Sequence, residues 1–356
     1  MSAGMHPIVI TGYGGISPIG ESLDQTCASV RAGIDMFQAH PIYVAGEDNP
    51  EWGDQKPMIA SCVPTLEPDL KGMDRLEALG LAALLDLLDR LPLKREDIGD
   101  TALFFALPRI DEVTRTWGLD DAFPKRIAQT AGLDGLKRIG VQTAGHAGGF
   151  QLLRKTYELL TSGDVQHCIL VGLDSFVDLD RLALMDQDWR LKSDRTVDGF
   201  IPGEGAAAIL LELPEAAARG ERKELARIVG FGEGSEPNQL SHEKNSLGEG
   251  LTEAIREATA ERIPEWVLCD MNGEQYWGFE WGVVQTRLGP TLASMHELTH
   301  AADCTGEIGA ASGPMMLGIV ARALAKGYAP SEEILCWTAS EGEERSAVYL
   351  AAGSEN

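Results

Sequence analysis

Short apolar runs alternate with longer, more polar stretches along this 356-residue chain. The runs are continuous, as in strands buried on both faces of a sheet. The stretch at residues 73–91 is amphipathic and rich in Leu and Ala, which predicts a helix. Alternating strands and helices indicate an α/β fold. The expected strands cover residues 8–10, 101–107, 138–142, 167–172, 206–213, 226–229, 266–269, 334–337 and 346–352, and the expected helices cover 73–91, 148–162, 251–262 and 309–325.

The two parts of the chain echo each other. Residues 143–160 and 303–326 each combine a small-residue turn with an Ala- or Leu-rich helix that follows a predicted strand. There is no repeat of short period, so a solenoid is not expected. The echo predicts two similar halves.

Composition narrows the function classes. The chain has 55 acidic and 30 basic residues and a net charge of −25. This charge disfavours nucleic acids and anionic membranes, and it suits a basic partner, although solubility alone also explains it. The sequence shows no secretory signal peptide and no apolar stretch near the length of a membrane span. The six cysteines form no CxxC motif, so we expect no metal, no cofactor and a reducing, cytoplasmic location.

The most informative segment is 141–150, which reads Val-Gln-Thr-Ala-Gly-His-Ala-Gly-Gly-Phe. It has the form of a strand-to-helix elbow that presents a nucleophile, but the presenting position is Gly145. Glycine has no side chain, so it cannot attack a thioester or transfer a proton. The elbow is therefore expected without its reactive atom.

Four blocks of sequence resemble the β-ketoacyl synthases, the condensing enzymes of the thiolase fold. The resemblance implies a five-layer α/β/α/β/α sandwich of two similar halves, residues 1–215 and 216–356, in one compact unit. It also implies a dimer formed through edge strands and a site shaped for acyl chains on acyl carrier protein or coenzyme A. The four blocks are residues 9–20, 143–149, 170–175 and 198–207.

The same resemblance places the family's reactive groups on residues that cannot do their chemistry. The nucleophile falls on Gly145, the two histidines fall on Asn272 and Gly306, and the upstream lysine falls on Ala301. The loop that carries the gating phenylalanine is replaced by residues 340–344. Because the whole set is lost, we expect neither condensation nor malonyl decarboxylation.

Relocated chemistry is the alternative. Cys304 lies near Glu307 in sequence, and a Cys–His pair with His146 or His300 would provide a nucleophile and its base. His296 and His300 have the i, i+4 spacing of a metal pair but too few companion ligands, so no metal site is expected.

Two acidic clusters stand where the family's loops line the substrate entrance. They are expected to repel an anionic phosphopantetheine arm or coenzyme A. The clusters are Asp270, Glu274 and Glu280, and Glu341, Glu343 and Glu344.

An aromatic run follows the first cluster, with Tyr276, Trp277, Phe279 and Trp281 within six residues. These side chains do not keep to one side of a helix or a strand, so some of them are expected at an interface. Core packing is the competing interpretation.

The sequence thus predicts a catalytically inactive ketosynthase-like protein that acts by binding. It would form a homodimer, or it would pair with a ketosynthase-like subunit as chain-length factors do. An adaptor or chaperone, for example in toxin or effector export, is another form of the same hypothesis. The alternative is an acyl-thioester transferase or hydrolase with a relocated catalytic residue among His146, Cys304 and Glu307.

Overall fold

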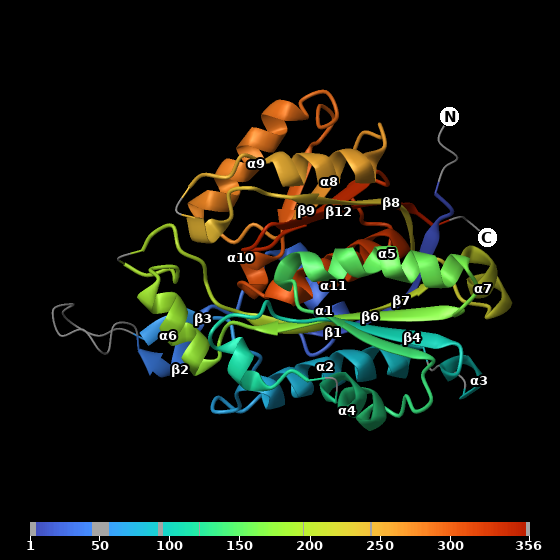
Figure 1. Ribbon diagram of the computed structural model, residues 1–356, viewed down its shortest axis with the longest axis horizontal. Coiled ribbons are helices and arrows are strands. Elements are labelled where there is room, and N and C mark those ends of the chain that lie inside the picture. The colour runs from blue at the N-terminus through green and yellow to red at the C-terminus, as the bar shows by residue number, and fades with distance from the viewer. Residues whose placement is uncertain are drawn as a thin grey trace.

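The computed structural model describes residues 5–44, 57–91, 95–120, 122–194, 196–242 and 244–353. The elements form five layers, helix, sheet, helix, sheet, helix (Figure 1). The middle layer holds α5 (Gly148–Thr161) and α11 (Ser312–Ala325). One outer layer holds α2 (Gly72–Arg90) and α4 (Phe123–Thr130), and the other holds α8 (Glu249–Thr259) and α9 (Gln275–Arg287). The predicted five-layer α/β sandwich is confirmed.

The two sheet layers repeat one strand order. The first runs β5-β4-β6-β7-β1 and the second runs β10-β9-β11-β12-β8, which is the same order when each set is counted along the chain. A short antiparallel contact between β1 and β8, at Ile8↔Ile228 through Ile10↔Ala226, joins them. The strands are β1 (Ile8–Ile16), β4 (Thr101–Ala106), β5 (Arg138–Gln142), β6 (His167–Ser175), β7 (Glu204–Glu212), β8 (Ala226–Ser235), β9 (Trp266–Cys269), β10 (Glu297–His300), β11 (Ile334–Ala339) and β12 (Glu344–Ala352).

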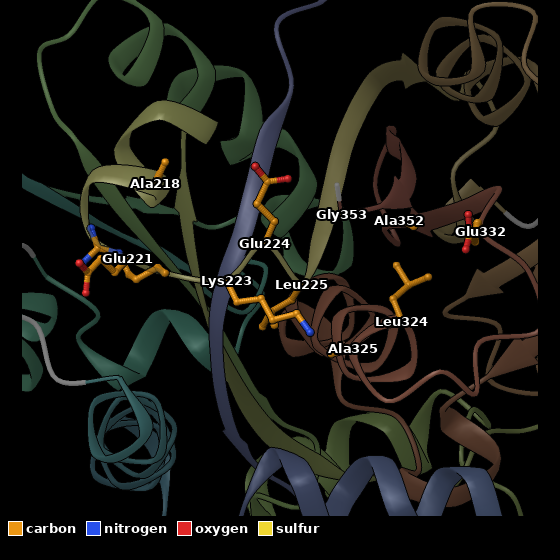
Figure 2. A pocket seen from close by; sticks show the side chains of 11 residues that line it. Ala218, Glu221, Lys223, Glu224, Leu225, Leu324, Ala325, Glu332, Ala352 and Gly353 are labelled. Carbon is orange, nitrogen blue, oxygen red and sulfur yellow. The ribbon is translucent and has the colours of Figure 1, made fainter. Parts of the chain in front are cut away.

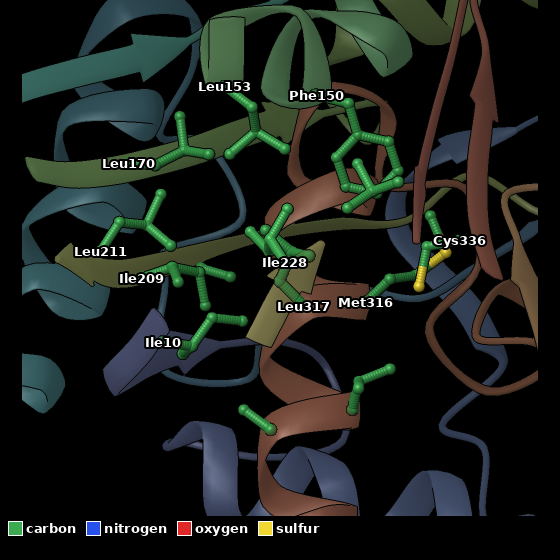
Figure 3. Close-up of a cluster of buried hydrophobic side chains, with 14 of the residues drawn as sticks. Ile10, Phe150, Leu153, Leu170, Ile209, Leu211, Ile228, Met316, Leu317 and Cys336 are labelled. Atoms are coloured by element: carbon green, nitrogen blue, oxygen red, sulfur yellow. The ribbon is translucent and has the colours of Figure 1, made fainter. Parts of the chain in front are cut away.

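The main core lies between the sheets (Figure 3). Helix α11 is buried almost all round, which suits its run of Ala, Met, Leu, Ile and Val. Phe150 and Leu153 of α5 pack against the same cluster as Leu317 of α11. Each middle helix follows a 3₁₀ turn, η3 (Gly145–Ala147) or η5 (Gly309–Ala311), so the echo between 143–160 and 303–326 is a structural repeat.

Smaller elements surround this frame. The hairpin β2 (Gln38–Val44) and β3 (Pro57–Ala60) stands apart from both sheet layers, beside α6 (Leu179–Gln187) (Figure 1). The others are α1 (Leu23–Ala32), α3 (Arg95–Ile98), η2 (Thr114–Trp117), α7 (Pro214–Arg219), η4 (Leu240–His242) and α10 (Ala302–Thr305).

Among the elements of the five layers, the sequence pattern missed α4, α9 and β10. Strand β10 is short and partly exposed, and α9 carries aromatic side chains and two glycines in place of a clear apolar stripe. The expected boundary between residues 215 and 216 stays a prediction, and it lies within α7, between the two strand sets. In the described ranges, no helix is both long and apolar enough to cross a membrane.

Candidate functional site

The elbow between β5 and α5 is present, and residues from other segments, Arg109 and Ser340, pack against it. Gly145 has φ +65°, and a Cβ added there would lie 3.4 Å from Cβ of Arg109. The hydroxyl of Ser340 accepts a hydrogen bond from the backbone N–H of Ala147 at 2.9 Å and donates one to the carbonyl of Ala144 at 2.5 Å. One N–H of the helix start that would face an anionic ligand is therefore already paired within the chain.

The turn before α11 presents Glu307 to this elbow. Gly306 has φ +69°, and a Cβ there would lie 2.9 Å from the carbonyl oxygen of Ile201 and 3.2 Å from Cα of Gly203. This packing leaves no room for a side chain at 306. The family resemblance places the second catalytic histidine on Gly306. In the structure, the side chain that enters the site from this turn is that of Glu307.

Glu307 joins the two halves through a buried cluster. Its Oε1 lies 2.8 Å from Nε2 of His146, and its Oε2 accepts a hydrogen bond from Nδ2 of Asn272 at 2.6 Å. The backbone N–H of Gly309 donates to Oε1 at 2.7 Å. His146 and Glu307 are both buried. The structure thus brings together three of the predicted site residues, His146, Asn272 and Glu307.

The cluster is built as an ion pair. Burial opposes a charged imidazole, but the carboxylate of Glu307 outweighs it and raises the pKa of His146 to about 10. Burial likewise opposes ionisation of Glu307, yet His146 and the hydrogen bonds from Gly309 and Asn272 lower its pKa. At neutral pH His146 is protonated, so it has no lone pair with which to act as a general base.

Asp270 stands next to this pair at the end of β9. Its carboxylate accepts a hydrogen bond from the backbone N–H of Ala339 at 3.0 Å. Burial raises the pKa of Asp270 to about 7, against the opposing charge of His146. The carboxyl group links the ends of β9 and β11.

Arg190 forms ion pairs with carboxylates of both predicted acidic clusters. Its guanidinium binds Glu274 through two hydrogen bonds, of 2.7 and 2.9 Å, and also pairs with Glu341. Burial opposes ionisation of Glu341, but Arg190 holds the pKa of that carboxyl at about 2. One arginine therefore pairs with a carboxylate from each acidic cluster.

Two further residues of the clusters, Glu280 and Glu343, are also engaged. Glu280 is buried and pairs with Arg345 at 2.9 Å, and Glu343 accepts a hydrogen bond from the hydroxyl of Ser235 at 2.8 Å. The two clusters do not stand as free carboxylates, because Asp270 is buried and Glu274, Glu280 and Glu341 are paired with arginines. Repulsion of an anionic arm stays a prediction. No local pattern points to Arg190, because its partners lie 84 and 151 residues further along the chain.

The aromatic run belongs to helix α9. Trp277 and Trp281 are one turn apart and only 4% exposed, and Trp281 stacks on Trp337 at 5.1 Å between ring centroids. As interface candidates these two are wrong, because they belong to the core of the second half. Tyr276 is partly buried, and Phe279 is exposed.

Cys304 does not have the surroundings of a nucleophile. It lies in α10, and burial together with Asp303 and Asp35 raises the pKa of its thiol. Reactive cysteines have lowered pKa values beside positive charge. His300 pairs with Asp303 at 2.9 Å, and no hydrogen bond in the described part of the chain joins Cys304 to His146 or His300. Ala301 is buried and leads into α10.

Two hollows open on the surface. A hollow of about 780 Å³ lies away from the site, between α7, the end of α11 and the end of β12, with Lys223 and Glu224 projecting from its wall (Figure 2). Another, of about 490 Å³, borders the site beside α9, because Glu274 lines it together with Phe279 and His300. Across the described ranges, no group of three or more His, Cys, Asp or Glu side chains is arranged to hold a metal ion.

Comparisons with known proteins agree with this architecture. Residues 108–217 match the family described as Beta-ketoacyl synthase, N-terminal domain. No curated protein sequence matches the chain. Three solved structures superpose over nearly its whole length, at identities that establish the fold alone.

The first is the ishigamide ketosynthase/chain length factor, with a TM-score of 0.72, 18% identity, and 97% of this chain and 99% of that chain covered. The second is a type II PKS acyl-carrier protein in complex with its ketosynthase bound to the hexaketide, with a TM-score of 0.80, 13% identity, and 98% and 99% covered. The third is a Beta-ketoacyl synthase from Burkholderia phymatum, with a TM-score of 0.74, 17% identity, and 98% and 100% covered. The chain therefore has the fold of the ketosynthases over nearly its full length, and its residues 108–217 match the N-terminal domain of the β-ketoacyl synthase family.

Proposed function

We propose that this protein is a catalytically silent ketosynthase-like subunit that acts by binding another protein. One observation carries the proposal. At the elbow the reactive position is Gly145, and the neighbouring histidine, His146, is committed to a buried ion pair with Glu307. A site whose acid and base neutralise each other, without a nucleophile, has no group left to take an acyl chain.

The contacts made around the elbow support the same conclusion. Ser340 caps the N–H of Ala147 at the elbow, and Arg190 ties together Glu274 and Glu341. A thioester of acyl carrier protein or coenzyme A would have to break these contacts to reach Gly145. We therefore place the function on the surface of the protein.

The edge of the first sheet supports a partner subunit. Strand β5 is the last strand of its set, and Val141 on it is exposed. An edge strand offers unpaired N–H and C=O groups to another sheet. We propose that this edge pairs with a second copy or with a ketosynthase-like subunit; a ketosynthase/chain length factor shares the fold. All six cysteines are free thiols, which supports a reducing, cytoplasmic setting.

Intact-protein mass spectrometry tests the loss of acyl transfer. The protein is incubated with acetyl- and malonyl-thioesters of acyl carrier protein and of coenzyme A, and its mass is compared with that of the untreated protein. We expect no adduct and no turnover. An acyl adduct that disappears in Cys304→Ala would overturn the proposal and support the relocated-nucleophile alternative. An adduct that persists in that variant would overturn it as well, and peptide mapping would then locate the acylated residue.

Capture from the native host tests the binding role. A tagged chain should recover one partner in fixed stoichiometry. Recovery of an intact ketosynthase supports the partner-subunit form, and recovery of another protein supports an adaptor or chaperone. Recovery of nothing beyond this chain contradicts a hetero-partner.

A further inference from the structure

The hollow beside the start of α9 has walls from three elements of the second half. Its volume is about 490 Å³. Helix α9 contributes Phe279, the last residue of β10 is His300, and α10 contributes Asp303. Strands β9 and β10 run parallel, so the hollow lies at their carboxyl ends, where open α/β sheets bind their ligands. We call it the α9 hollow.

Glycine keeps the α9 hollow open. Gly273 and Gly278 both line it, and a Cβ added at Gly278 would meet open space. The side chain of Phe279, on the same wall, is exposed. An aromatic ring provides a large contact area and a face that attracts cations. The hollow therefore combines an accessible aromatic ring with room for a further side chain.

His300 and Asp303 supply hydrogen-bond acceptors. Nδ1 of His300 lies 2.9 Å from Oδ2 of Asp303. Because a carboxylate only accepts hydrogen bonds, Nδ1 carries the proton, and Nε2 of the neutral imidazole is an acceptor. The side chain of Asp303 is 74% exposed. Within the described residues, neither Nε2 of His300 nor Oδ1 of Asp303 has a hydrogen-bond partner, so both atoms can accept from a ligand.

The charges around the α9 hollow favour a cation. Among the described residues, no lysine or arginine lines it. From residue 263 to residue 321 the only Lys or Arg in the sequence is Arg287, at the far end of α9. Glu274 meets the positive end of the α9 dipole, and Arg190 already pairs with this carboxylate. The charge left for a ligand is that of Asp303.

A guanidinium group matches this set of groups. It is a cation with five N–H donors in a planar fork, and it stacks on aromatic faces. It can donate to the free acceptors of Asp303 and His300 while its plane lies against Phe279, since all three residues line the same hollow. An ammonium group has no plane to stack and is more strongly hydrated. An anion would instead face carboxylates.

We infer that the α9 hollow is a docking pocket for an arginine side chain of a partner protein. This inference rests on the proposed function and specifies the chemistry of one contact with the partner.

NMR with capped amino acids tests the inference. The full chain, labelled with ¹³C in Met methyl groups and in Phe and His rings, is titrated at pH 8 with N-acetyl-arginine methylamide to about 20 mM, a range that detects weak binding. We expect saturable shifts at Met271, Phe279 and His300, reduced by salt. The capped citrulline has the same shape without the charge and should bind at least tenfold more weakly. The capped lysine should bind between these two, and the capped glutamate should not bind.

Variants locate the binding. Asp303→Asn removes an exposed charge and should weaken the arginine probe about tenfold. Its control, Glu297→Gln, removes an exposed charge from β10 that does not line the hollow, and it should leave binding unchanged. Gly278→Leu should fill the hollow and abolish binding, whereas Gly278→Ala should leave room for the probe.

The following results would overturn the inference. They are the absence of saturable shifts, equal binding of the arginine and citrulline probes, shifts centred outside the hollow, and equal loss in Asp303→Asn and Glu297→Gln. Free L-arginine carries two charged groups that a residue within a chain lacks. If it binds at least tenfold more tightly than the capped form, the hollow is a site for the free amino acid and not a docking pocket.

Partner capture with the same variants separates this inference from the proposed function. The partner recovered by the wild-type chain should be lost with Asp303→Asn and kept with Glu297→Gln. If both variants keep it, the docking pocket is removed and the silent-subunit function stands. An acyl adduct in the thioester experiment removes that function whatever the probes do.

Discussion

Glu307→Gln tests the buried ion pair directly. The substitution keeps the shape of the side chain but leaves the buried imidazole of His146 without its counter-charge. Removing one partner of a buried pair costs about 3–5 kcal/mol. A rise in the pKa of His146 from 6.5 to about 10 sets an upper bound of about 5 kcal/mol, at about 1.36 kcal/mol per tenfold change in proton affinity. We therefore expect the free energy of unfolding to fall by about 3–5 kcal/mol at pH 6.

The effect depends on pH with a definite sign. Because the folded pKa of His146 lies above its ordinary value of 6.5, its stabilisation is complete below pH 6.5 and is lost as the pH rises toward 10. Because the pKa of Glu307 is lowered from 4.5, its stabilisation is present above pH 4.5 and is lost in acid. The wild-type protein should lose about 3 kcal/mol between pH 6.5 and 9, and the variant should change much less.

Urea unfolding followed by tryptophan fluorescence at pH 6 and pH 9 provides the measurement. Asp303→Asn is the matched control, since it breaks the exposed His300–Asp303 pair and should cost less than about 0.5 kcal/mol. A Glu307→Gln protein as stable as the wild type at pH 6, or a loss of equal size at pH 6 and pH 9, would refute the reasoning.

Three further predictions test the surroundings. Gly145→Cys should fold, with the free energy of unfolding lowered by about 1–2 kcal/mol because the residue has φ +65°. It should show no condensation in a radiolabelled malonyl assay; recovered condensation would mean that the missing catalytic histidines are not decisive. Arg190→Met should lower the free energy of unfolding by about 3–5 kcal/mol in urea because it leaves two carboxylates unpaired, and Arg190→Lys should restore less than half of that. Gly278→Ala, in open space within α9, should raise the melting temperature through a gain of about 1 kcal/mol, whereas Gly306→Ala should lower it; the opposite order would contradict the assigned packing.

The sequence was informative where structure depends on local pattern. Continuous apolar runs predicted the buried strands, and the small-residue turns before residues 148 and 312 predicted two matching middle helices. The elbow at Gly145 could be identified because its form resides in one short segment. The aromatic run failed as a prediction because α9 has no clear apolar stripe, and the burial of Trp277 and Trp281 depends on what packs against them.

The site itself was decided by contacts between distant segments. His146 and Glu307 are 161 residues apart, and Arg190 reaches one partner from each acidic cluster. No local pattern states which carboxylates an arginine neutralises, or that the backbone of Ile201 leaves Glu307, and not Gly306, to face the elbow. The sequence by itself determined the layered frame and the missing nucleophile, because both follow from the order of residue types along the chain. Only the tertiary structure decided that the vacated site holds buried ion pairs, because burial and charge pairing depend on which segments the fold brings together.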